Sequence, residues 1–313
     1  MSENRWSEIE YDKIPSKAGL KYKNAFARRD IERIKAGVQT YEEFAKDETK
    51  TVNAGTLYPY EVVDKATKVW TRRGWYDYIL PPMDDTNRLM VNKYWDNLTD
   101  YFNGATFNGI AVVDTSGSMT GNSASCPINV AISLGMYCAE RAKGPFAGHY
   151  ISFASRPQLI AVEGVDFCDK VKRIYQTNLC DNTNLEAVFD LILDNAISYH
   201  MSQDDLPQNV IIITDMEFDS ACGFGYWGNN RGKDKLTLME GIEKKFEAAG
   251  YELPKLIFWN VDARQNNIPM LGNGPISYVS GMSPAIFETI MSGKTGYELM
   301  MEKLDSPRYS VIG

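Results

Sequence analysis

The most informative segment of the sequence is Gly109-Ile-Ala-Val-Val113, followed by Asp114-Thr-Ser116-Gly-Ser118. Its first five residues are a short, continuous apolar run, which is typical of a strand buried on both faces. Asp114 ends the run, and the residues after it are small or carry hydroxyl groups. This order predicts a buried strand whose carboxyl end opens into a polar loop.

Strand and helix patterns alternate beyond this stretch. We expect strands at 149–154, 209–214, 256–259 and 276–280, a candidate antiparallel edge strand at 158–162, and helices at 127–141, 185–199, 235–249 and 284–292. Alternation of this kind predicts an α/β fold with a doubly wound, mostly parallel sheet.

The residues before this region follow a helical pattern. Thr40 is an N-cap candidate for a short helix, and Pro59 fits the first turn of a helix expected over 61–71. Apolar residues recur at helical spacing over 90–102, and we find no strand pattern in this half. We therefore expect a small all-helical region at 1–104 and an α/β domain at 105–313.

Composition and charge exclude several protein classes. The chain has 313 residues, 44% of them hydrophobic and 24% charged, which is ordinary for a globular protein and excludes a disordered or fibrous one. The net charge of −8 argues against indiscriminate polyanion binding by the whole chain. Residues 1–100 hold equal numbers of basic and acidic side chains, so the acidic excess lies after them.

The cysteines and the apolar runs indicate a cytoplasmic protein. The 5 cysteines are an odd number without CxxC spacing, so we expect reduced thiols. The first ten residues lack a secretory pattern, and no run approaches the ~20 apolar residues of a membrane span. We expect no contact with a membrane.

Polar residues follow two of the expected strands and precede one helix. Asp114, Ser116 and Ser118 follow the first strand, Asp215 follows 209–214, and Thr183 lies in the loop before the helix at 185. Open α/β sheets bind ligands beyond the carboxyl ends of their strands. These positions are therefore the first candidates for a site.

The three segments together resemble the von Willebrand factor A domain and its metal-ion-dependent adhesion site. The resemblance implies that Asp114, Ser116, Ser118, Thr183 and Asp215 hold Mg²⁺, with Mn²⁺ or Ca²⁺ as alternatives. It also implies that a partner's Asp or Glu completes the coordination. All five side chains offer oxygen, which suits these cations. Capping of the next helix by Ser116 or Ser118 would explain the loop alone but not the other two segments.

Two further carboxylates, Glu217 and Asp219, follow Asp215 closely. They are candidates for a place near the cation, as competing ligands or as selectors of the partner; solvation at the start of a loop is the alternative. With Asp114 and Asp215 they would also imitate the carboxylate cluster of a metal-dependent nuclease. A phosphodiesterase is therefore the enzymatic alternative, although we expect no catalysis.

Segments outside the metal motif carry a second resemblance. Leu57-Tyr-Pro-Tyr-Glu-Val-Val63 and Asn92-Lys-Tyr-Trp-Asp-Asn-Leu-Thr-Asp-Tyr-Phe102 are similar to the stretch that joins helical repeats to the A domain in Ro-type RNA-binding proteins. Ser152-Phe-Ala-Ser155 and Val279-Ser-Gly-Met-Ser283 look like an uncharacterised A-domain family of unknown function. About 100 residues cannot close a Ro-type ring at ~40–47 residues per helical repeat.

A basic cluster in the first helical region is the remaining hint of nucleic acid. Tyr22 and Phe26 are interleaved with the candidate RNA-binding residues Lys21, Lys23, Arg28, Arg29 and Arg33. A solvated basic face packed through its aromatic residues is the alternative interpretation.

The sequence thus favours a non-catalytic, Mg²⁺-dependent interaction module that binds a carboxylate of a protein partner, within a ribonucleoprotein-like complex. RNA binding by the basic helices is the alternative function. The sequence leaves the partner and the oligomeric state open.

Overall fold

The computed structural model describes residues 5–72, 75–102, 104, 107–120, 126–177, 183–215, 232–262, 270–273, 276–292 and 296–309. The chain divides into two compact units, which are described separately. Unit 1 comprises Met1–Val69, Tyr78–Asp100 and Glu163–Thr177, and unit 2 comprises Trp70–Asp77, Tyr101–Val162 and Asn178–Gly313.

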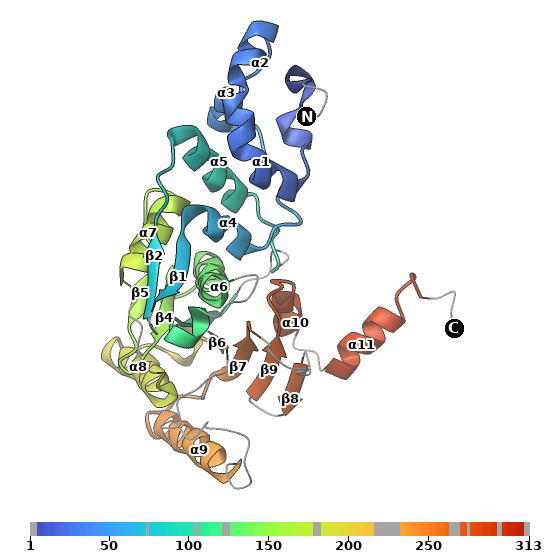
Figure 1. Cartoon of the computed structure of the whole chain (residues 1–313). Helices are drawn as coiled ribbons and strands as arrows, with labels where there is room; N and C mark the ends of the chain where they lie inside the picture. Colours follow the sequence, from blue (N-terminus) through green and yellow to red (C-terminus); the bar gives the residue numbers. More distant parts are fainter. Residues whose placement is uncertain are drawn as a thin grey trace. The chain divides into compact units, whose positions relative to one another are not determined.

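Unit 1 is built from helices, as Figure 1 shows. They are α1 (Ser16–Arg28), α2 (Asp30–Ala36), α3 (Tyr41–Lys46), α4 (Pro59–Ala66), α5 (Asp85–Asp96) and α7 (Phe167–Thr177). Thr40 caps α3 as expected: its Oγ1 accepts a hydrogen bond from the backbone N–H of Glu43 (3.1 Å), and the Glu43 carboxylate accepts one from the N–H of Thr40 (2.8 Å).

Helix α5 organises unit 1, because α1, α3, α4 and α7 all pack against it. Arg88 of α5 donates two hydrogen bonds of 2.7 Å to Asp166, just before α7, and Trp95 stacks on Phe167 at 4.4 Å. A bidentate guanidinium–carboxylate pair fixes orientation as well as distance. These contacts tie α7 to α5, although the two helices are far apart in the sequence.

The expectation that this half holds no strand was wrong at one place. The helix expected over 61–71 ends at Ala66, and β1 (Lys68–Arg72) and β2 (Trp75–Ile79) form a two-stranded sheet. Val69-Trp70-Thr71 is β-branched and aromatic, which favours a strand over continuation of the helix. The helical character of the rest is confirmed.

Unit 2 contains a seven-stranded sheet in the order β5-β4-β3-β6-β7-β9-β8. The strands are β3 (Gly109–Asp114), β4 (His149–Phe153), β5 (Leu159–Ala161), β6 (Asn209–Thr214), β7 (Lys255–Asn260), β8 (Met270–Asn273) and β9 (Ile276–Ser280). All neighbours are parallel except the edge pairs β4–β5 and β8–β9. The predicted α/β fold with a mostly parallel, doubly wound sheet is confirmed.

The two faces of the sheet are covered by different helices. Side chains alternate between faces along a strand, so Val113 and Val112 point to opposite sides. Val113 meets Gly135 of α6 (Pro127–Arg141), whereas Val112 lies in the core beneath α8 (Leu185–Ser198) and α9 (Gly232–Ala248). The remaining helices are α10 (Ile286–Ser292) and α11 (Gly296–Leu304).

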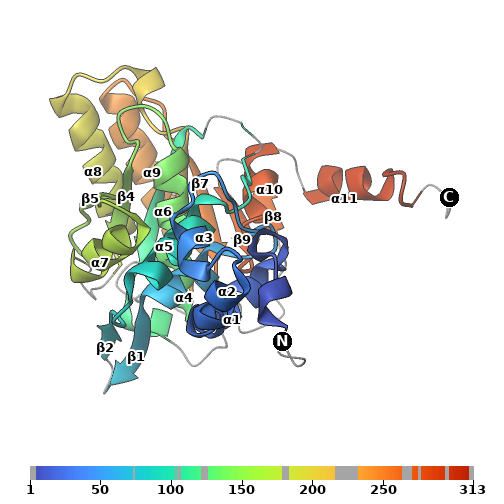
Figure 2. The same cartoon turned by 90° about the horizontal axis from the view of Figure 1, so that it is seen from above.

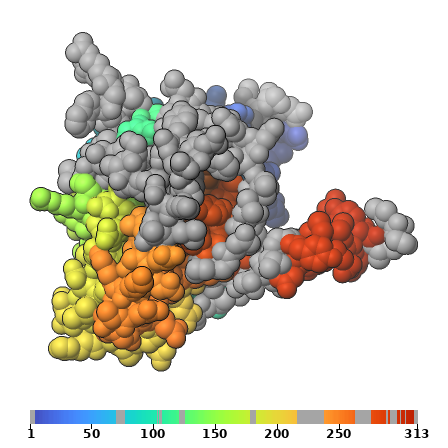
Figure 3. All heavy atoms as spheres, turned by 90° about the horizontal axis from the view of Figure 1, so that it is seen from below, coloured from blue at the N-terminus to red at the C-terminus, as the bar shows by residue number. Residues whose placement is uncertain are grey.

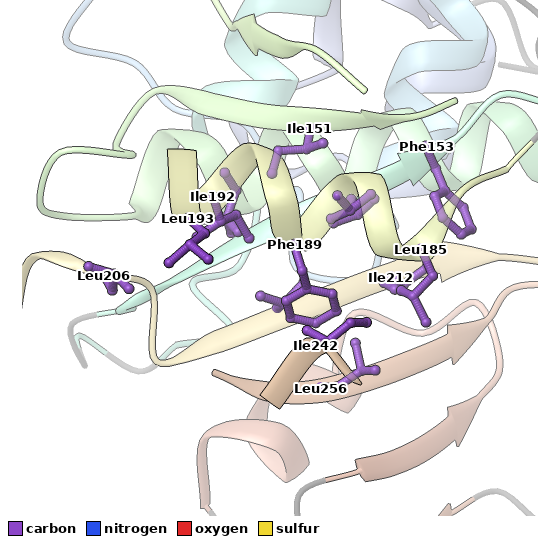
Figure 4. Close-up of a cluster of buried hydrophobic side chains, with 14 of the residues drawn as sticks. Ile151, Phe153, Leu185, Phe189, Ile192, Leu193, Leu206, Ile212, Ile242 and Leu256 are labelled. Carbon is purple, nitrogen blue, oxygen red and sulfur yellow. The ribbon is translucent and has the colours of Figure 1, made fainter. Parts of the chain in front are cut away.

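The core beneath α8 and α9 is continuous and apolar. Figure 4 shows Phe189 of α8 pointing toward Ile242 of α9, and Leu185 of α8 beside Ile212 of β6. Figures 2 and 3 show α8 and α9 side by side at the surface of unit 2. Burial of this many aliphatic and aromatic side chains is the main force that holds the sheet and these helices together.

The structure describes three of the cysteines, and helices whose length and apolarity bear on the expected absence of a membrane span. Cys126, Cys138 and Cys168 carry thiols rather than disulfides, and Cys180 and Cys222 lie outside the described residues. Within the part of the chain that the structure describes, no helix has the length and apolarity needed to cross a membrane.

Candidate metal centre

The candidate site lies at the carboxyl ends of β3 and β6, where the strand order reverses. The chain passes from β3 to β4 on one side and later returns to β6 on the other. In parallel register Val113 pairs with Ile213, so Asp114 comes beside Thr214, and Asp215 follows directly. Ligands of doubly wound folds bind at this kind of switch point.

Asp114 is the centre of the hydrogen-bond network. Its buried Oδ2 accepts a hydrogen bond from Oγ1 of Thr214 (2.6 Å), and its Oδ1 accepts one from the backbone N–H of Ser116 (2.9 Å). Burial raises the pKa of Asp114 to about 6, although both hydrogen bonds act in the opposite direction; the charge of Asp215 adds to the rise.

The loop after β3 brings two serine hydroxyls together. Oγ of Ser116 and Oγ of Ser118 are 3.1 Å apart. A short 3-10 turn over Gly117–Thr120 holds this arrangement, because Thr120 donates to the carbonyl of Gly117 (2.7 Å) and the N–H of Met119 donates to that of Ser116 (3.1 Å). The loop is thereby folded back toward Asp114.

The start of α8 lies toward the same edge of the sheet as Asp114, and Thr183 comes just before it. Thr183 is buried two residues before α8, whose first residue, Leu185, packs in one cluster with Phe153 and Ile212 near the carboxyl ends of β4 and β6. Asn184 caps α8 by accepting a hydrogen bond from the N–H of Ala187 (3.1 Å). Figure 4 shows Leu185, Phe153 and Ile212 at one end of this core.

The five predicted residues offer only oxygen atoms, from two carboxylates and three hydroxyls. This donor set fits a hard divalent cation such as Mg²⁺, which prefers oxygen ligands and keeps some of its waters. In the described ranges no three His, Cys, Asp or Glu side chains gather as a metal cluster, so the hydroxyls would have to supply part of the coordination. Glu217 and Asp219 lie outside the described residues, and their role stays a prediction.

Thr214 is the site residue that the sequence motif did not single out. From the neighbouring strand β6, its hydroxyl donates a hydrogen bond to Oδ2 of Asp114. The available signal was a lone hydroxyl residue at the end of an otherwise apolar strand, Asn209-Val-Ile-Ile-Ile-Thr214.

The structure corrects the predicted RNA-binding set at two positions. Lys23 is only 9% exposed and donates a hydrogen bond to Oδ1 of Asn87 (2.8 Å). Arg33 is 5% exposed and donates to the carbonyls of Trp6 (2.6 Å) and Gln39 (2.6 Å). Both are structural, because buried cations held by protein acceptors cannot contact phosphate.

Three members of the basic set remain at the surface. Lys21, Arg28 and Arg29 are exposed, and Arg29 pairs with Glu32 at 2.6 Å. Phe26, expected to be interleaved with them, is buried among aromatic rings that include Tyr11 and Tyr41. RNA binding through the three exposed side chains stays a prediction.

Two family models match different parts of the chain. The one described as "Domain of unknown function (DUF7788)" matches residues 108–308, and the one described as "Domain of unknown function (DUF2828)" matches residues 1–104. A curated relative, Uncharacterized protein L728 of Acanthamoeba polyphaga mimivirus, is 30% identical over 308 residues. The match covers 94% of this chain and 49% of that protein, so the chain spans about half the length of the relative.

Solved structures with a similar chain trace are more distant in sequence. The RO (RSR) protein of Deinococcus radiodurans is 16% identical with a TM-score of 0.46, over 89% of this chain and 52% of that one. Proximal thread matrix protein 1 of the mussel byssus, solved with a zinc-occupied MIDAS motif, is 11% identical with a TM-score of 0.35, over 60% of this chain and 47% of that one.

Proposed function

This chain belongs to the family described as "Domain of unknown function (DUF7788)", and we propose that it is a non-catalytic module that binds a divalent cation, Mg²⁺ above all, and through it a carboxylate of a protein partner. The observation that carries the proposal is the network at the switch point, in which Asp114, Ser116 and Ser118 are held together beside Asp215. Thr183 at the same edge would complete the set.

The charge of the donor set favours a partner that supplies a carboxylate. Asp114 and Asp215 are the only carboxylates of the predicted set, and the serine and threonine hydroxyls are neutral ligands. A divalent cation with few carboxylates bound directly keeps part of its charge and gains from one more anionic oxygen. An Asp or Glu of another protein provides such an oxygen.

The positions of the histidines support a non-catalytic role. The chain has 2 histidines, the side chain most often used as a general base. His149 begins β4, with Nδ1 at 2.8 Å from the carbonyl of Ala147, and His200 follows the end of α8. Both lie at the amino-terminal edge of the sheet, opposite the candidate site, so neither is placed to serve chemistry there.

Calorimetric titration with Mg²⁺ tests this function. We expect saturable binding by the chelator-treated wild type, loss of binding in Asp114→Ala, and unchanged binding in Asp204→Asn. Asp204 is an exposed aspartate in the short turn Gln203–Asp205 before β6, at the opposite edge of the sheet, and controls for general charge effects. Equal heats for the wild type and Asp114→Ala would refute a cation site at this position.

A further inference from the structure

Helix α2 of unit 1 buries an arginine and exposes both of its isoleucines. It spans Asp30–Ala36 and follows α1 in the chain (Figure 1). Ile31 is 66% exposed and Ile34 is 65% exposed, whereas Arg33 is only 5% exposed. A surface helix normally turns its apolar residues toward the core and its charged residues toward water. The packing of unit 1 thus leaves two large aliphatic side chains, the isoleucine pair Ile31 and Ile34, in contact with water.

The buried guanidinium of Arg33 fixes the orientation of this helix. It donates hydrogen bonds to the backbone carbonyls of Trp6 (2.6 Å), Ile9 (3.0 Å) and Gln39 (2.6 Å). It also lies 4.4 Å from the ring centroid of Tyr11. Removing a buried cation from its acceptors leaves an uncompensated charge, which is strongly unfavourable. Helix α2 is therefore held with Arg33 on its inner side.

Asp30 fixes the same inner side at the start of the helix. Its Oδ1 accepts a hydrogen bond from the backbone N–H of Tyr41 (2.7 Å), and its Oδ2 accepts one from the N–H of Glu42 (3.1 Å). Residues three positions apart lie on one side of a helix, so Asp30 and Arg33 act together. A rotation of α2 that buried the isoleucine pair would break both sets of hydrogen bonds. The exposure of the pair is therefore a consequence of how unit 1 packs.

The surface around the isoleucine pair carries an excess of positive charge. Lys35 follows the pair directly on the same side of α2, and Arg28 comes three positions before it, in the last turn of α1. Both cations are exposed. Glu32 is the acid of this surface, and it pairs with Arg29 at 2.6 Å. An acidic ligand is therefore favoured at the pair.

We propose that the isoleucine pair is a docking site for an acidic amphipathic segment of a partner protein. Such a segment has two aliphatic or aromatic side chains one helical turn apart, with Asp or Glu beside them. The apolar side chains would cover the pair, and the carboxylates would face Arg28 and Lys35. Apolar contacts of this kind supply most of the affinity, and the opposite charges orient the two surfaces.

Other occupants fit these observations less well. A symmetric pairing of α2 with the same helix of a second copy would bring like charges together, which disfavours it. Anionic membranes are typically recognised by clusters of about 4–8 basic residues, more than this surface offers. A nucleic acid would use the cations but would leave the isoleucine pair in water. The proposal is independent of the cation site, because none of these residues belongs to the set around Asp114.

Fluorescence anisotropy with labelled peptides tests the proposal on the full chain. The probe is an alanine-based peptide of about 16 residues, long enough to form a helix, with two leucines one turn apart and glutamates beside them. One comparison peptide has the leucines replaced by alanine, and the other has the glutamates replaced by lysine. We expect saturable binding of the acidic peptide, and binding at least about tenfold weaker for each comparison peptide.

Two variants separate the apolar contact from the charge. Ile31→Ala/Ile34→Ala is expected to weaken binding of the acidic peptide by about tenfold or more. Alanine has the higher helix propensity, so this variant should keep its fold, and far-ultraviolet circular dichroism checks that it does. Arg28→Glu/Lys35→Glu is expected to lose the acidic peptide and to bind the lysine peptide instead, since the charges are then complementary again.

The matched controls change similar side chains elsewhere. Tyr199→Ala removes a large apolar side chain that is exposed in unit 2, and Lys172→Glu/Lys244→Glu reverses two exposed cations on α7 and α9. Binding of the acidic peptide is expected to be unchanged in both.

Several results would overturn the proposal. They are no binding of the acidic peptide by the wild type, unchanged affinity in the isoleucine variant, and no exchange of peptide preference in the charge-reversed variant. Three further assays use phosphatidylserine vesicles, oligouridine RNA and sedimentation of the protein alone. Vesicle binding, RNA binding or self-association that is lost in Ile31→Ala/Ile34→Ala would assign the pair to a lipid, a nucleic acid or a second copy instead.

Discussion

Replacing the central carboxylate by an amide should make the metal-free protein more stable. In Asp114→Asn the side-chain oxygen still accepts the hydrogen bond from the N–H of Ser116, and the amide can donate to the Thr214 hydroxyl, which accepts as well as donates. The shape of the site is therefore kept, and only the buried negative charge is removed. A buried carboxylate that binds a cation is expected to destabilise the folded protein when the cation is absent.

The magnitude follows from the pKa of Asp114. The pKa is about 6 in the folded protein and 3.8 in the reference state, and each unit corresponds to 1.36 kcal/mol. Because the folded value is the higher one, the folded state binds more protons between the two values. The contribution of Asp114 to the free energy of unfolding is thus most favourable below pH 3.8. It falls as the pH rises to about 6, by on the order of 3 kcal/mol in total.

Urea unfolding in the presence of a chelator measures the effect. At pH 8 we expect Asp114→Asn to exceed the wild type in free energy of unfolding by about 1–3 kcal/mol, and at pH 5 by clearly less. Asp205→Asn is the control of opposite sign. Its exposed carboxylate accepts hydrogen bonds from the N–H (2.9 Å) and the hydroxyl (2.7 Å) of Ser202, which lower its pKa, so its loss should reduce stability at pH 8.

A metal-free Asp114→Asn protein that is no more stable than the wild type at pH 8 would show that the buried charge of Asp114 does not destabilise the fold. So would a stability difference that does not change between pH 8 and pH 5, because the effect must then have a cause other than ionisation.

Further predictions concern packing and helix ends, and each is measured by the free energy of unfolding. Gly135→Ala should destabilise the protein by about 1–3 kcal/mol, because the added methyl group would clash with Cγ2 of Val113. Gly241→Ala, in open space on α9, should stabilise it by about 0.5–1 kcal/mol. The opposite order of the two effects would refute the packing of α6 on β3. His200→Gly should stabilise by about 0.4–1 kcal/mol, because His200 has a φ of 51° after α8, and a loss of stability there would contradict the assigned backbone. Lys21→Ala/Arg28→Ala/Arg29→Ala should change stability little, since the three side chains are exposed. Lys23→Ala should destabilise the protein, because Oδ1 of Asn87 loses its buried donor. Similar losses in both variants would contradict the distinction between surface and core cations.

Elements with a strong local pattern were predictable from the sequence. Strand β6 has the expected bounds, because four consecutive aliphatic residues are typical of a strand that is buried on both faces of a sheet. Helix α6 likewise begins at Pro127 and ends at Arg141 as expected. The Asp114 loop was readable because its three polar residues lie within five positions of each other.

Elements and side chains whose surroundings come from distant residues were not predictable. Helix α7 was missed, although Phe167, Val171 and Ile174 have helical spacing, and its partners Arg88 and Trp95 come from another part of the sequence. The burial of Lys23 depends in the same way on Asn87, with which it shares no local pattern. A count of basic residues cannot distinguish a surface cation from one held in the core.

A crystal structure grown with Mg²⁺ and acetate would show directly whether this site binds a cation together with a carboxylate. We expect one cation at the ends of β3 and β6, bound through oxygens of the set Asp114, Ser116, Ser118, Thr183 and Asp215, with an acetate oxygen in one of its ~6 coordination positions. A carboxylate of Glu217 or Asp219 in that position, or no cation at this edge of the sheet, would contradict it.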